Sequence, residues 1–367
     1  MKLRIPGPTP VPASVLAQMS RPMINHRGPE FAALIAEITE ALKRCYRTRS
    51  DVLTLTASGT GALEAGVVNF LSPGDRVLGI TIGFFGDRIA DIAESYGAIV
   101  HRLAAEPGNA IDPNAVRDAL RRAPDTRAVL VTHNESSTGV TNPLAEIARM
   151  VRETDALVIV DAVSSLAGID VRTDEWGLDV VATASQKAWA APPGLAMVSV
   201  SERAWAAQRI ARMPRYYWDL AAAKSWLTRG QTQATPAISI YFALAEALHV
   251  LEQEGLDQAI ARHTRLGQRA RAGACSLGLE LLADPSVASN TVTAIRVPVG
   301  IDGNAIVSGV RDRFGIELAG GQGSLAGKVF RVGHLGWVTD GDIDEALSAI
   351  RDVLAGLGHR LPTTARN

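Results

Sequence analysis

A short stretch of small and polar residues in the first part of the sequence has the residue types that bind an anion. Residues 56–62 read TASGTGA, and a helical pattern of apolar residues follows them. In such a loop Gly59 lets backbone N–H groups approach a phosphate closely, while the positive end of the following helix and the hydroxyls of Ser58 and Thr60 add further donors. An ordinary helix cap is the alternative, because serine, threonine and glycine begin many helices.

Two further residues, Asp161 and Lys187, stand where a parallel sheet would expose them to a ligand. Asp161 ends the apolar run at 156–160, and ligands of such sheets bind at the carboxyl ends of the strands. Lys187 lies in a loop of small residues, 185–194, between two apolar strand candidates. The alternatives are a carboxylate that caps the next turn and a solvated surface lysine.

A phosphate loop, a carboxylate at a strand end and an enclosed lysine are together what pyridoxal 5'-phosphate requires. Its phosphate binds a helix N-terminus, its aldehyde is held by a lysine with a lowered pKa, and its pyridine nitrogen must stay protonated. An ionised Asp161 beside that nitrogen would favour the charged form. We therefore predict a pyridoxal phosphate site in which Lys187 and Asp161 are the catalytic residues.

The elements that position these residues are predicted by apolar runs that alternate with amphipathic stretches between residues 50 and 200. This pattern is typical of strand–helix–strand units and of an α/β fold with a mostly parallel sheet. The strand candidates are too apolar to have one face in water, so helices should cover both faces. The last strand follows its predecessor after only ten residues, too few for a crossover helix, so it should be antiparallel. The six candidates are residues 76–82, 98–103, 128–132, 156–160, 180–184 and 195–200.

The pattern changes near residue 255, and the chain is long enough for about two domains. A helical pattern at 237–254 leads out of the first domain. Beyond it lie strand candidates at 291–297 and 328–332 and helix candidates at 304–313 and 340–357. We expect an extended N-terminal arm at 1–15, a large α/β domain at 16–255 and a small α+β domain at 256–367. The proline-rich arm is expected to make few contacts of its own and to need a partner surface.

The composition argues against several classes of partner. With 37 basic and 38 acidic residues the net charge is −1, which provides no field of one sign for nucleic acid or an anionic membrane. The first ten residues lack the apolar core of a secretory signal, and no long uncharged apolar span follows, so we expect a cytoplasmic protein. Cys45 and Cys275 have no spacing typical of a metal site or a disulfide framework, and both are expected to be buried thiols.

Several short motifs occur in order along nearly the whole chain. They read PGPTP at 6–10, SGTG at 58–61, GFFGDR at 83–88, HNESSTG at 133–139, VDAVSS at 160–165, SQK at 185–187, APPG at 191–194 and FRVG at 330–333. This set resembles the class V aminotransferases of fold type I, in the alanine–glyoxylate and serine–pyruvate aminotransferase branch. The resemblance implies a mostly parallel seven-stranded sheet domain, a smaller α+β C-terminal domain and a homodimer with shared active sites.

The resemblance also implies how further residues contact the cofactor. Phe85 would stack on the ring, where relatives often have tryptophan, and phenylalanine keeps the stacking surface. Val163 would pack against the opposite face of the ring. Ser136 would lie near the phenolic oxygen, and Gln186 would donate to the phosphate. Without the resemblance, each of these four residues would be interpreted as ordinary packing or turn chemistry.

Substrate contacts and contacts from a second subunit are implied in the same way. Arg331 matches the arginine that binds the substrate carboxylate, for which a bidentate guanidinium is well suited; its alternative is a surface ion pair. Thr232 and Thr235 occupy the stretch through which a neighbouring subunit reaches the phosphate, although a tyrosine common there in relatives is absent. The motif NHR at 25–27 also occurs in the family near the site entrance, and a solvated turn is an equal interpretation of it.

The activity implied by the resemblance is a two-step ping-pong transamination. A small L-amino acid, alanine or serine, displaces Lys187 from the cofactor, and the freed amine then moves a proton as a general base. A 2-oxo acid, glyoxylate or pyruvate, accepts the amino group as the steps reverse.

Two alternatives to this activity remain at the level of sequence. A cysteine desulfurase or another lyase of the same fold needs a cysteine on a mobile loop and usually a histidine at the position of Gln186, and neither cysteine here lies in such a loop. A catalytically silent homologue that acts as an interaction protein is the other, because some relatives have been described as hydrogenase subunits. The presence of Lys187, Asp161 and Arg331 argues against it.

Overall fold

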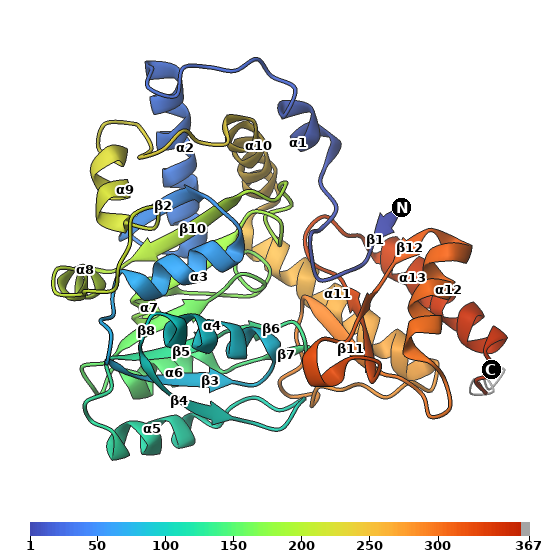
Figure 1. The fold of residues 1–367 in the computed structure, drawn as a ribbon. Coiled ribbons are helices and arrows are strands. Elements are labelled where there is room, and N and C mark those ends of the chain that lie inside the picture. Colours follow the sequence, from blue (N-terminus) through green and yellow to red (C-terminus); the bar gives the residue numbers. More distant parts are fainter. Residues whose placement is uncertain (361–367) are drawn as a thin grey trace.

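A seven-stranded sheet forms the centre of the larger part of the molecule in the computed structural model, which describes residues 1–360 (Figure 1). The strand order is β2-β10-β9-β8-β5-β3-β4, and β10 alone runs antiparallel to its neighbours in this sheet. In chain order the strands are β2 (Asp51–Thr56), β3 (Arg76–Thr81), β4 (Ile99–Ala104), β5 (Ala128–Thr132), β8 (Leu157–Asp161), β9 (Val180–Ala184) and β10 (Leu195–Val200). The predicted parallel α/β sheet and the antiparallel last strand are therefore confirmed.

The six predicted strands begin and end within one residue of the observed ones, but β2 was not predicted. Its sequence, DVLTLT, contains two threonines and an aspartate. These polar residues interrupt the apolar run. The fold tolerates them because β2 lies at one edge of the sheet, next to β10.

Helices cover the two faces of the sheet because successive side chains of a strand point to opposite sides. In β5, Val129 and Val131 belong to one buried cluster, whereas Ala128 and Leu130 belong to the other. The first cluster includes side chains of α2 (Pro29–Tyr46), α5 (Pro113–Arg122), α6 (Leu144–Val151) and α10 (Ile238–Glu254). The second includes those of α3 (Gly59–Val68), α4 (Phe84–Ser95), α8 (Glu202–Gln208) and α9 (Leu220–Leu227).

The expectation that every predicted strand is covered on both faces is wrong for β4. Ile99 is 58% exposed and His101 is also exposed. β4 is the second edge of the sheet and pairs only with β3, so its outer side chains lie beyond the helices that cover the inner strands.

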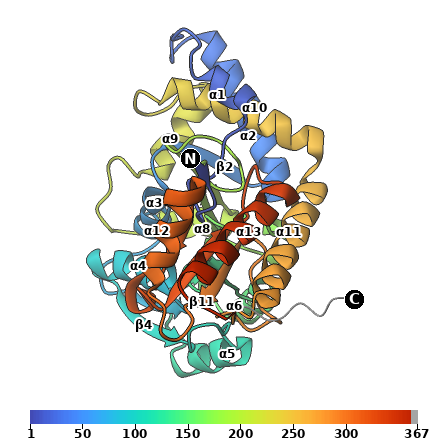
Figure 2. The same ribbon diagram turned by 90° about the vertical axis from the view of Figure 1, so that its right-hand side faces the viewer.

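The part of the chain beyond residue 255 forms a three-stranded antiparallel sheet with helices against it. Its order is β11-β14-β13, and Figure 2 views this region with α11, α12 and α13 in front. The predicted strands and helices here are confirmed, but the 21-residue helix α11 was not predicted. The elements are α11 (Leu256–Ser276), β11 (Val292–Arg296), α12 (Gly303–Phe314), β12 (Ile316–Glu317), β13 (Ala319–Gly320), η1 (Gly323–Leu325), β14 (Val329–Gly333) and α13 (Asp340–Gly356). The proposed domain limits at residues 15 and 255 stay a prediction.

The N-terminal segment contacts its own chain, so the expectation of an arm with few contacts is wrong. β1 (Lys2–Leu3) pairs in parallel with β12, and Arg4 and Thr9 are buried. α1 (Ala13–Gln18) follows and packs against α10. The remaining short elements are β6 (Asn134–Glu135), β7 (Val140–Thr141) and α7 (Thr173–Trp176).

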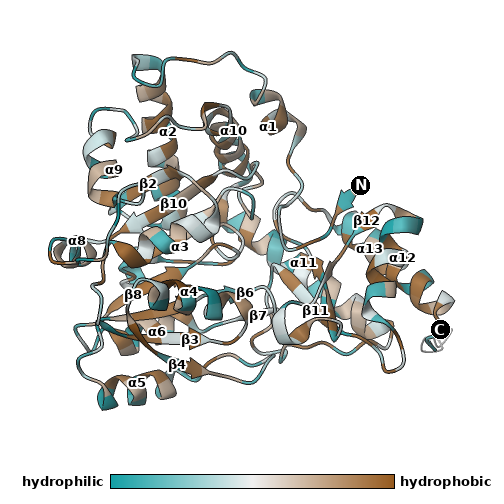
Figure 3. Ribbon diagram, viewed as in Figure 1, coloured by the Kyte–Doolittle hydropathy of each residue, from teal (hydrophilic) through white to brown (hydrophobic). Residues whose placement is uncertain are grey.

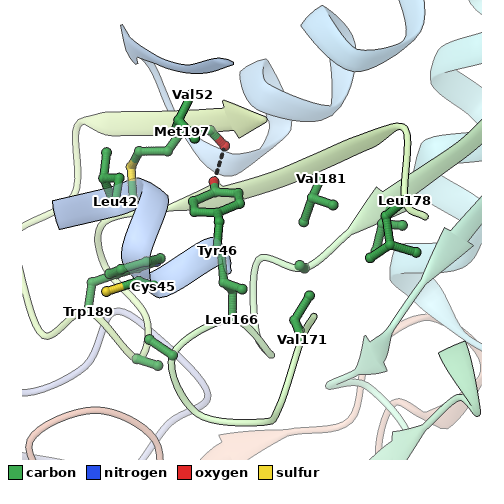
Figure 4. Close-up of a cluster of buried hydrophobic side chains, with 14 of the residues drawn as sticks. Leu42, Cys45, Tyr46, Val52, Leu166, Val171, Leu178, Val181, Trp189 and Met197 are labelled. Carbon is green, nitrogen blue, oxygen red and sulfur yellow. Dashed lines mark hydrogen bonds between the residues drawn. The ribbon is translucent and has the colours of Figure 1, made fainter. Parts of the chain in front are cut away.

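A buried aromatic cluster supports the loop that follows β9. The Tyr46 hydroxyl donates to the Met197 carbonyl at 2.9 Å, and the Tyr46 and Trp189 rings stack with centroids 6.3 Å apart (Figure 4). Trp189 also donates from Nε1 to Thr183 Oγ1 at 3.2 Å. Cys45 is buried in the same cluster, as expected, but Cys275 near the end of α11 is exposed, which corrects the prediction for that thiol.

Apolar residues concentrate on the central strands, while polar residues face outward on helices such as α5 (Figure 3). Within residues 1–360, no helix has both the length and the apolar character needed to cross a membrane.

Candidate active site

A cavity of about 550 Å³ of empty space lies at the carboxyl ends of the parallel strands. It is bounded by the N-terminus of α3, the start of α4 and the loops after β5, β8 and β9. The structure therefore brings together residues that are far apart in the sequence. The lining residues are Ser58, Gly59, Thr60, Leu63, Phe85, Arg88, Asn134, Ser136, Asp161, Val163, Ser164, Gln186 and Lys187.

Lys187 enters this cavity from a loop that is held at its base. The Ser185 hydroxyl donates to the Pro192 carbonyl at 2.6 Å and accepts from the Leu195 N–H at 3.2 Å. The Lys187 amine donates to the Pro6 carbonyl at 2.7 Å. Burial lowers the pKa of Lys187 to about 8, because desolvation disfavours the ammonium form more than the nearby Asp161 favours it. The alternative interpretation of Lys187 as a solvated surface lysine is thus excluded.

Asp161 is 4% exposed at the end of β8. Its Oδ1 accepts from the Val163 N–H at 2.9 Å, and Oδ2 lies 3.4 Å from the Thr132 hydroxyl. Burial, with a smaller contribution from the buried Glu135 carboxyl, raises the pKa of Asp161 to about 6. The carboxylate therefore closes a turn and also faces the cavity, so the two interpretations made from the sequence do not exclude each other.

The N-terminus of α3 presents its first turn to the cavity. Ser58 is the N-cap and accepts from the Gly61 N–H at 3.4 Å, so the helix-cap interpretation is also correct. Ser58 and Thr60 are exposed to the cavity mouth, whereas Gly59 is buried. A Cβ at Gly59 would lie 3.1 Å from a Val163 methyl group, so a larger residue here would crowd the wall that Val163 forms.

Two partly buried side chains, Phe85 and Val163, line the cavity together with Gln186. The Gln186 Oε1 is buried and, within residues 1–360, has no hydrogen-bond partner. An unpaired buried polar atom of this kind is costly unless a ligand or water satisfies it. A hydrogen-bond donor from a ligand or a water would satisfy this atom.

Ser136, which lines the cavity, contacts Arg331, which is not among the lining residues, although 195 residues separate the two. The Arg331 guanidinium donates from Nη1 to the Ser136 carbonyl at 2.9 Å, and its Nε and Nη2 donate to the Gly320 carbonyl at 3.0 and 2.8 Å. Gln322 Oε1 accepts a further bond at 3.0 Å. Arg331 is 5% exposed, and burial lowers its pKa to about 10. The expected alternative, a surface ion pair, is wrong because these acceptors are neutral.

The sequence did not single out five residues in or beside the cavity, of which Glu135 and Arg88 make the contacts described next; the others are Leu63, Asn134 and Ser164. Glu135 is fully buried and accepts from the Phe85, Gly86 and Ser137 N–H groups and from the Ser137 hydroxyl. It thereby joins the start of α4 to the β6–β7 turn and fixes the backbone of Phe85. Its place in the HNESSTG motif was the available signal, but its role depends on a contact with residues about fifty positions away.

Arg88 is another residue that was missed. Its guanidinium lies 4.9 Å from the ring centroids of both Phe84 and Phe85 and donates to Thr60 Oγ1 at 3.4 Å. The GFFGDR motif contains it, and its spacing from Phe85, three residues on in the same helix, could have indicated a shared face.

Thr232 and Thr235 are not among the residues that line the Lys187 cavity of their own chain. They line a separate pocket with Tyr217 and β2, and the Thr232 hydroxyl donates to the Ala234 carbonyl at 2.7 Å. Arg27, from the NHR motif, donates to the Thr232 carbonyl at 2.7 Å and stacks over Trp226. Their contribution to a neighbouring subunit stays a prediction.

Comparisons with known proteins bear on this arrangement. The family model for aminotransferase class V matches residues 5–337. The chain is 47% identical to a soluble hydrogenase small subunit of Synechococcus sp., over 97% of this chain and 94% of that protein. It is 36% identical to the L-aspartate–glyoxylate aminotransferase of Paracoccus denitrificans, over 96% and 91%. Among solved structures, the alanine–glyoxylate aminotransferase of Nostoc sp. superimposes with a TM-score of 0.93 at 32% identity, covering 96% of this chain and 94% of the other.

Proposed function

The chain belongs to the class V aminotransferase family and has the fold type I architecture of pyridoxal-phosphate aminotransferases, and from this premise we propose that it transfers the amino group of L-alanine or L-serine to glyoxylate or pyruvate. The cofactor of this family is pyridoxal phosphate. When bound, it supplies an electron-withdrawing ring that stabilises negative charge at the substrate Cα.

The convergence of Lys187, Asp161 and Gln186 on one cavity is the observation that carries the proposal. Two of them have an unmet chemical requirement that this cofactor would satisfy: the Lys187 amine has a lowered pKa, and the buried Asp161 has an unfavourable negative charge. Gln186 lines the same cavity, and its side-chain N–H groups could donate to the phosphate. A protonated ring nitrogen would stabilise Asp161, and the N-terminus of α3 would receive the phosphate.

The residues that line the cavity would have separate roles toward the cofactor. Lys187 anchors the cofactor covalently and, once released, moves a proton at the substrate Cα as a general base, for which a pKa near neutrality is well matched. Asp161 holds the proton on the ring nitrogen. Phe85 and Val163 confine the ring between them, and Ser58, Gly59, Thr60 and Gln186 hold the phosphate.

Arg331 would bind the α-carboxylate that amino donor and 2-oxo acceptor share. Its guanidinium is partly satisfied by neutral carbonyls, and the carboxylate of a substrate would replace weak partners by a charge-assisted pair. Glyoxylate as the acceptor is supported by the names of relatives, which include alanine–glyoxylate, serine–glyoxylate and L-aspartate–glyoxylate aminotransferases. We retain alanine and serine as donors because of the motifs that the chain has in common with that branch.

The two alternative functions, a cysteine desulfurase and a catalytically silent homologue, differ in what supports them. A cysteine desulfurase activity is disfavoured because burial raises the pKa of Cys45 to about 12, and neither Cys45 nor Cys275 lines the cavity. A silent homologue with a role in protein interaction is supported by the names of two relatives that are described as soluble hydrogenase subunits. A purified protein that is colourless and takes up no added pyridoxal phosphate would favour it.

A homodimer is part of the proposal, because Thr232 and Thr235 would complete the phosphate site of a partner subunit. Sedimentation at assay concentration is expected to show a dimer. An active monomer would contradict this part and would remove the proposed role of both threonines.

A half-reaction screen tests the proposed activity. The purified protein is loaded with pyridoxal phosphate, mixed with one amino acid at a time, and followed by cofactor absorbance. Alanine and serine are expected to convert the cofactor to its amino form, and glyoxylate or pyruvate to restore it. Conversion by aspartate but not by alanine or serine would contradict the proposed donors, and no conversion by any amino acid would contradict an aminotransferase activity.

A further inference from the structure

The N-terminal segment, residues 4–9, connects the region that carries Arg331 to the loop that carries Lys187. At its start, the Arg4 N–H donates to the Glu317 carbonyl at 2.8 Å, and the Arg4 carbonyl accepts from the Gly333 N–H at 2.6 Å. The Arg4 side chain is 4% exposed and pairs with Asp342 of α13. Figure 1 shows the segment leaving β1, beside β12, and running past the sheet to α1. This end of the segment is therefore firmly attached.

The other end of the segment surrounds Lys187. The Thr9 hydroxyl donates to the Lys187 carbonyl at 2.9 Å, and the Thr9 N–H donates to the Gln186 carbonyl at 3.2 Å. Between the two ends, the Pro6 carbonyl accepts from the Lys187 amine at 2.7 Å. Both the backbone and the side chain of the lysine are thus in contact with one short segment.

Gly7 allows this close approach for two reasons. Its φ of +137° lies in the region that side chains rarely adopt. A Cβ at this position would also lie 2.7 Å from Lys187 Nζ and 2.8–2.9 Å from Cδ and Cε. Any residue other than glycine would therefore displace the lysine side chain, the segment, or both.

We propose that residues 4–9 are a positioning segment that holds the free amine of Lys187 through the Pro6 carbonyl, so that the amine keeps a fixed place whenever it is not joined to the cofactor. This inference rests on the proposed function, in which Lys187 alternates between the cofactor and proton transfer. It gives the segment a role within its own subunit.

A carbonyl oxygen is well suited to this task because it accepts a hydrogen bond without taking or giving a proton. A carboxylate in its place would favour the ammonium form, so that less of the amine would be free to accept a proton. A neutral amine that donates one N–H to Pro6 keeps its lone pair free to accept a proton from a substrate. The contact thus orients the amine without adding a negative charge that would hold it in the ammonium form.

The same segment relates the amine to the proposed carboxylate site. Gly333 lies two residues after Arg331 on β14 and donates to Arg4, and a Cβ at Gly333 would lie 2.2 Å from the Ile5 carbonyl oxygen. The strand that carries Arg331 and the segment that holds Lys187 are therefore in direct backbone contact. A substrate bound by its carboxylate would meet the amine at a defined position.

Labelling of the cofactor-free protein is the first test. The variant is Gly7→Ala, and the matched control is Gly300→Ala, because Gly300 also has a positive φ, +82°, but no atom within 4 Å of the added Cβ. Acetylation of Lys187 by a small anhydride is measured by peptide mass spectrometry from pH 6 to pH 11. Gly7→Ala is expected to change the labelling rate of Lys187 several-fold and to shift its pH midpoint, while Gly300→Ala matches the wild type. Identical labelling in all three proteins would overturn the proposal.

A second variant covers the case in which Gly7→Ala does not fold. Thr9→Val keeps the shape of the side chain but removes its hydrogen bond to the Lys187 carbonyl, and a smaller change of labelling in the same direction is expected. Once loaded with cofactor, either variant should lose kcat, by about 10- to 100-fold for Gly7→Ala, since small misplacements of a reacting group have effects of this size. The KM for the amino donor should change less than about threefold, since Arg331 is intact. A loss confined to KM, or unchanged labelling in a folded Thr9→Val, would overturn the proposal. The labelling requires no amino donor, so it distinguishes this result from a failure of the proposed activity.

Discussion

Two buried aspartates at opposite ends of the same sheet have different surroundings. Asp161, at the carboxyl end of β8, and Asp179, just before the amino end of β9, are each 4% exposed. Asp179 accepts from the Val158 N–H and the Ser201 hydroxyl, both at 2.9 Å, and lies 3.4 Å from Arg203 Nε. Asp161 has one backbone donor at 2.9 Å and a hydroxyl at 3.4 Å.

The difference indicates what each carboxylate is for. Burial raises the pKa of both groups, but the partners of Asp179 lie within the fold, whereas Asp161 faces a cavity that also contains Lys187. A carboxylate left short of partners reduces stability, and it becomes useful only when a ligand supplies the missing cation. We therefore expect Asp161, at the carboxyl end of the sheet, to lower the stability of the cofactor-free protein and to serve catalysis. Asp179, at the amino end, is expected to stabilise the fold and to have no part in catalysis.

Replacing Lys187 should produce the largest effect. Lys187→Ala is expected to fold, to bind pyridoxal phosphate without a covalent link, and to lose about 10⁴-fold or more of the transamination rate, since both the anchor and the general base are removed. Lys43, which is partly exposed and pairs with Glu40, provides the control, Lys43→Ala. Borohydride reduction of the wild-type holoenzyme followed by peptide mass spectrometry should find the cofactor on Lys187, and an adduct on another lysine would contradict the assignment.

The two aspartates should respond to the same substitution in different ways. Asp161→Asn is expected to lower kcat by about 100- to 1000-fold, because a neutral amide no longer stabilises charge on the cofactor ring. Asp179→Asn should leave kcat within about twofold. Its unfolding free energy should instead fall by about 1–3 kcal/mol, since the bonds to Ser201 and Arg203 are disturbed. Steady-state kinetics and urea unfolding of both variants test this, and near-normal turnover by Asp161→Asn would make that carboxylate structural.

Replacing Arg331 should have a smaller effect on activity, and replacing Arg203 should have none. Arg331→Lys should cost roughly 1.5–3 kcal/mol in kcat/KM for alanine, serine, glyoxylate and pyruvate alike, because lysine lacks the bidentate fork. An amine without a carboxylate should react as well as before. Arg203→Lys, beside Asp179, is the control and should change none of these values. Equal loss for amines with and without a carboxylate would show that Arg331 supports the fold, and Arg27 would be the next candidate.

Stability against pH should show the smallest effect, and its sign follows from the raised pKa of Asp161. Its pKa in the folded protein, about 6, lies above the ordinary value of 3.8. The folded state therefore binds more protons between pH 4 and 6, and this contribution to stability is lost as the pH rises through that window. Cofactor-free Asp161→Asn should be more stable than the wild type at pH 8, by about 2–3 kcal/mol at most, and equal to it below pH 4. Urea unfolding at both pH values measures this, and a less stable variant at pH 8 would contradict it.

Local patterns in the sequence were enough to predict the inner strands and to propose Lys187 and Asp161, which the structure places in one cavity. The alternation of apolar residues in β5, β8 and β9 and the ten-residue loop before β10 are local properties, because strand geometry depends on neighbours one or two residues apart. Lys187 and Asp161 could be proposed for the same reason, since Asp161 adjoins one apolar run and Lys187 is the third residue after another. The local signal failed at β2, where an edge position tolerates threonines, and at the long helix α11.

The sequence does not reveal which distant residues lie in and beside the Lys187 cavity, because this depends on how the whole chain folds. Three contacts join segments that are far apart in the sequence, and their separation along the chain does not predict their distance in space. They are the contact of Arg331 with the Ser136 carbonyl, that of the Phe85 N–H with Glu135, and that of the Lys187 amine with the Pro6 carbonyl. The N-terminal segment was predicted to lack contacts because proline-rich ends have no periodicity that would reveal a partner. Its place was decided by backbone hydrogen bonds to β12 and β14 and by glycines that permit close approach, and such contacts exist only once the whole chain has packed.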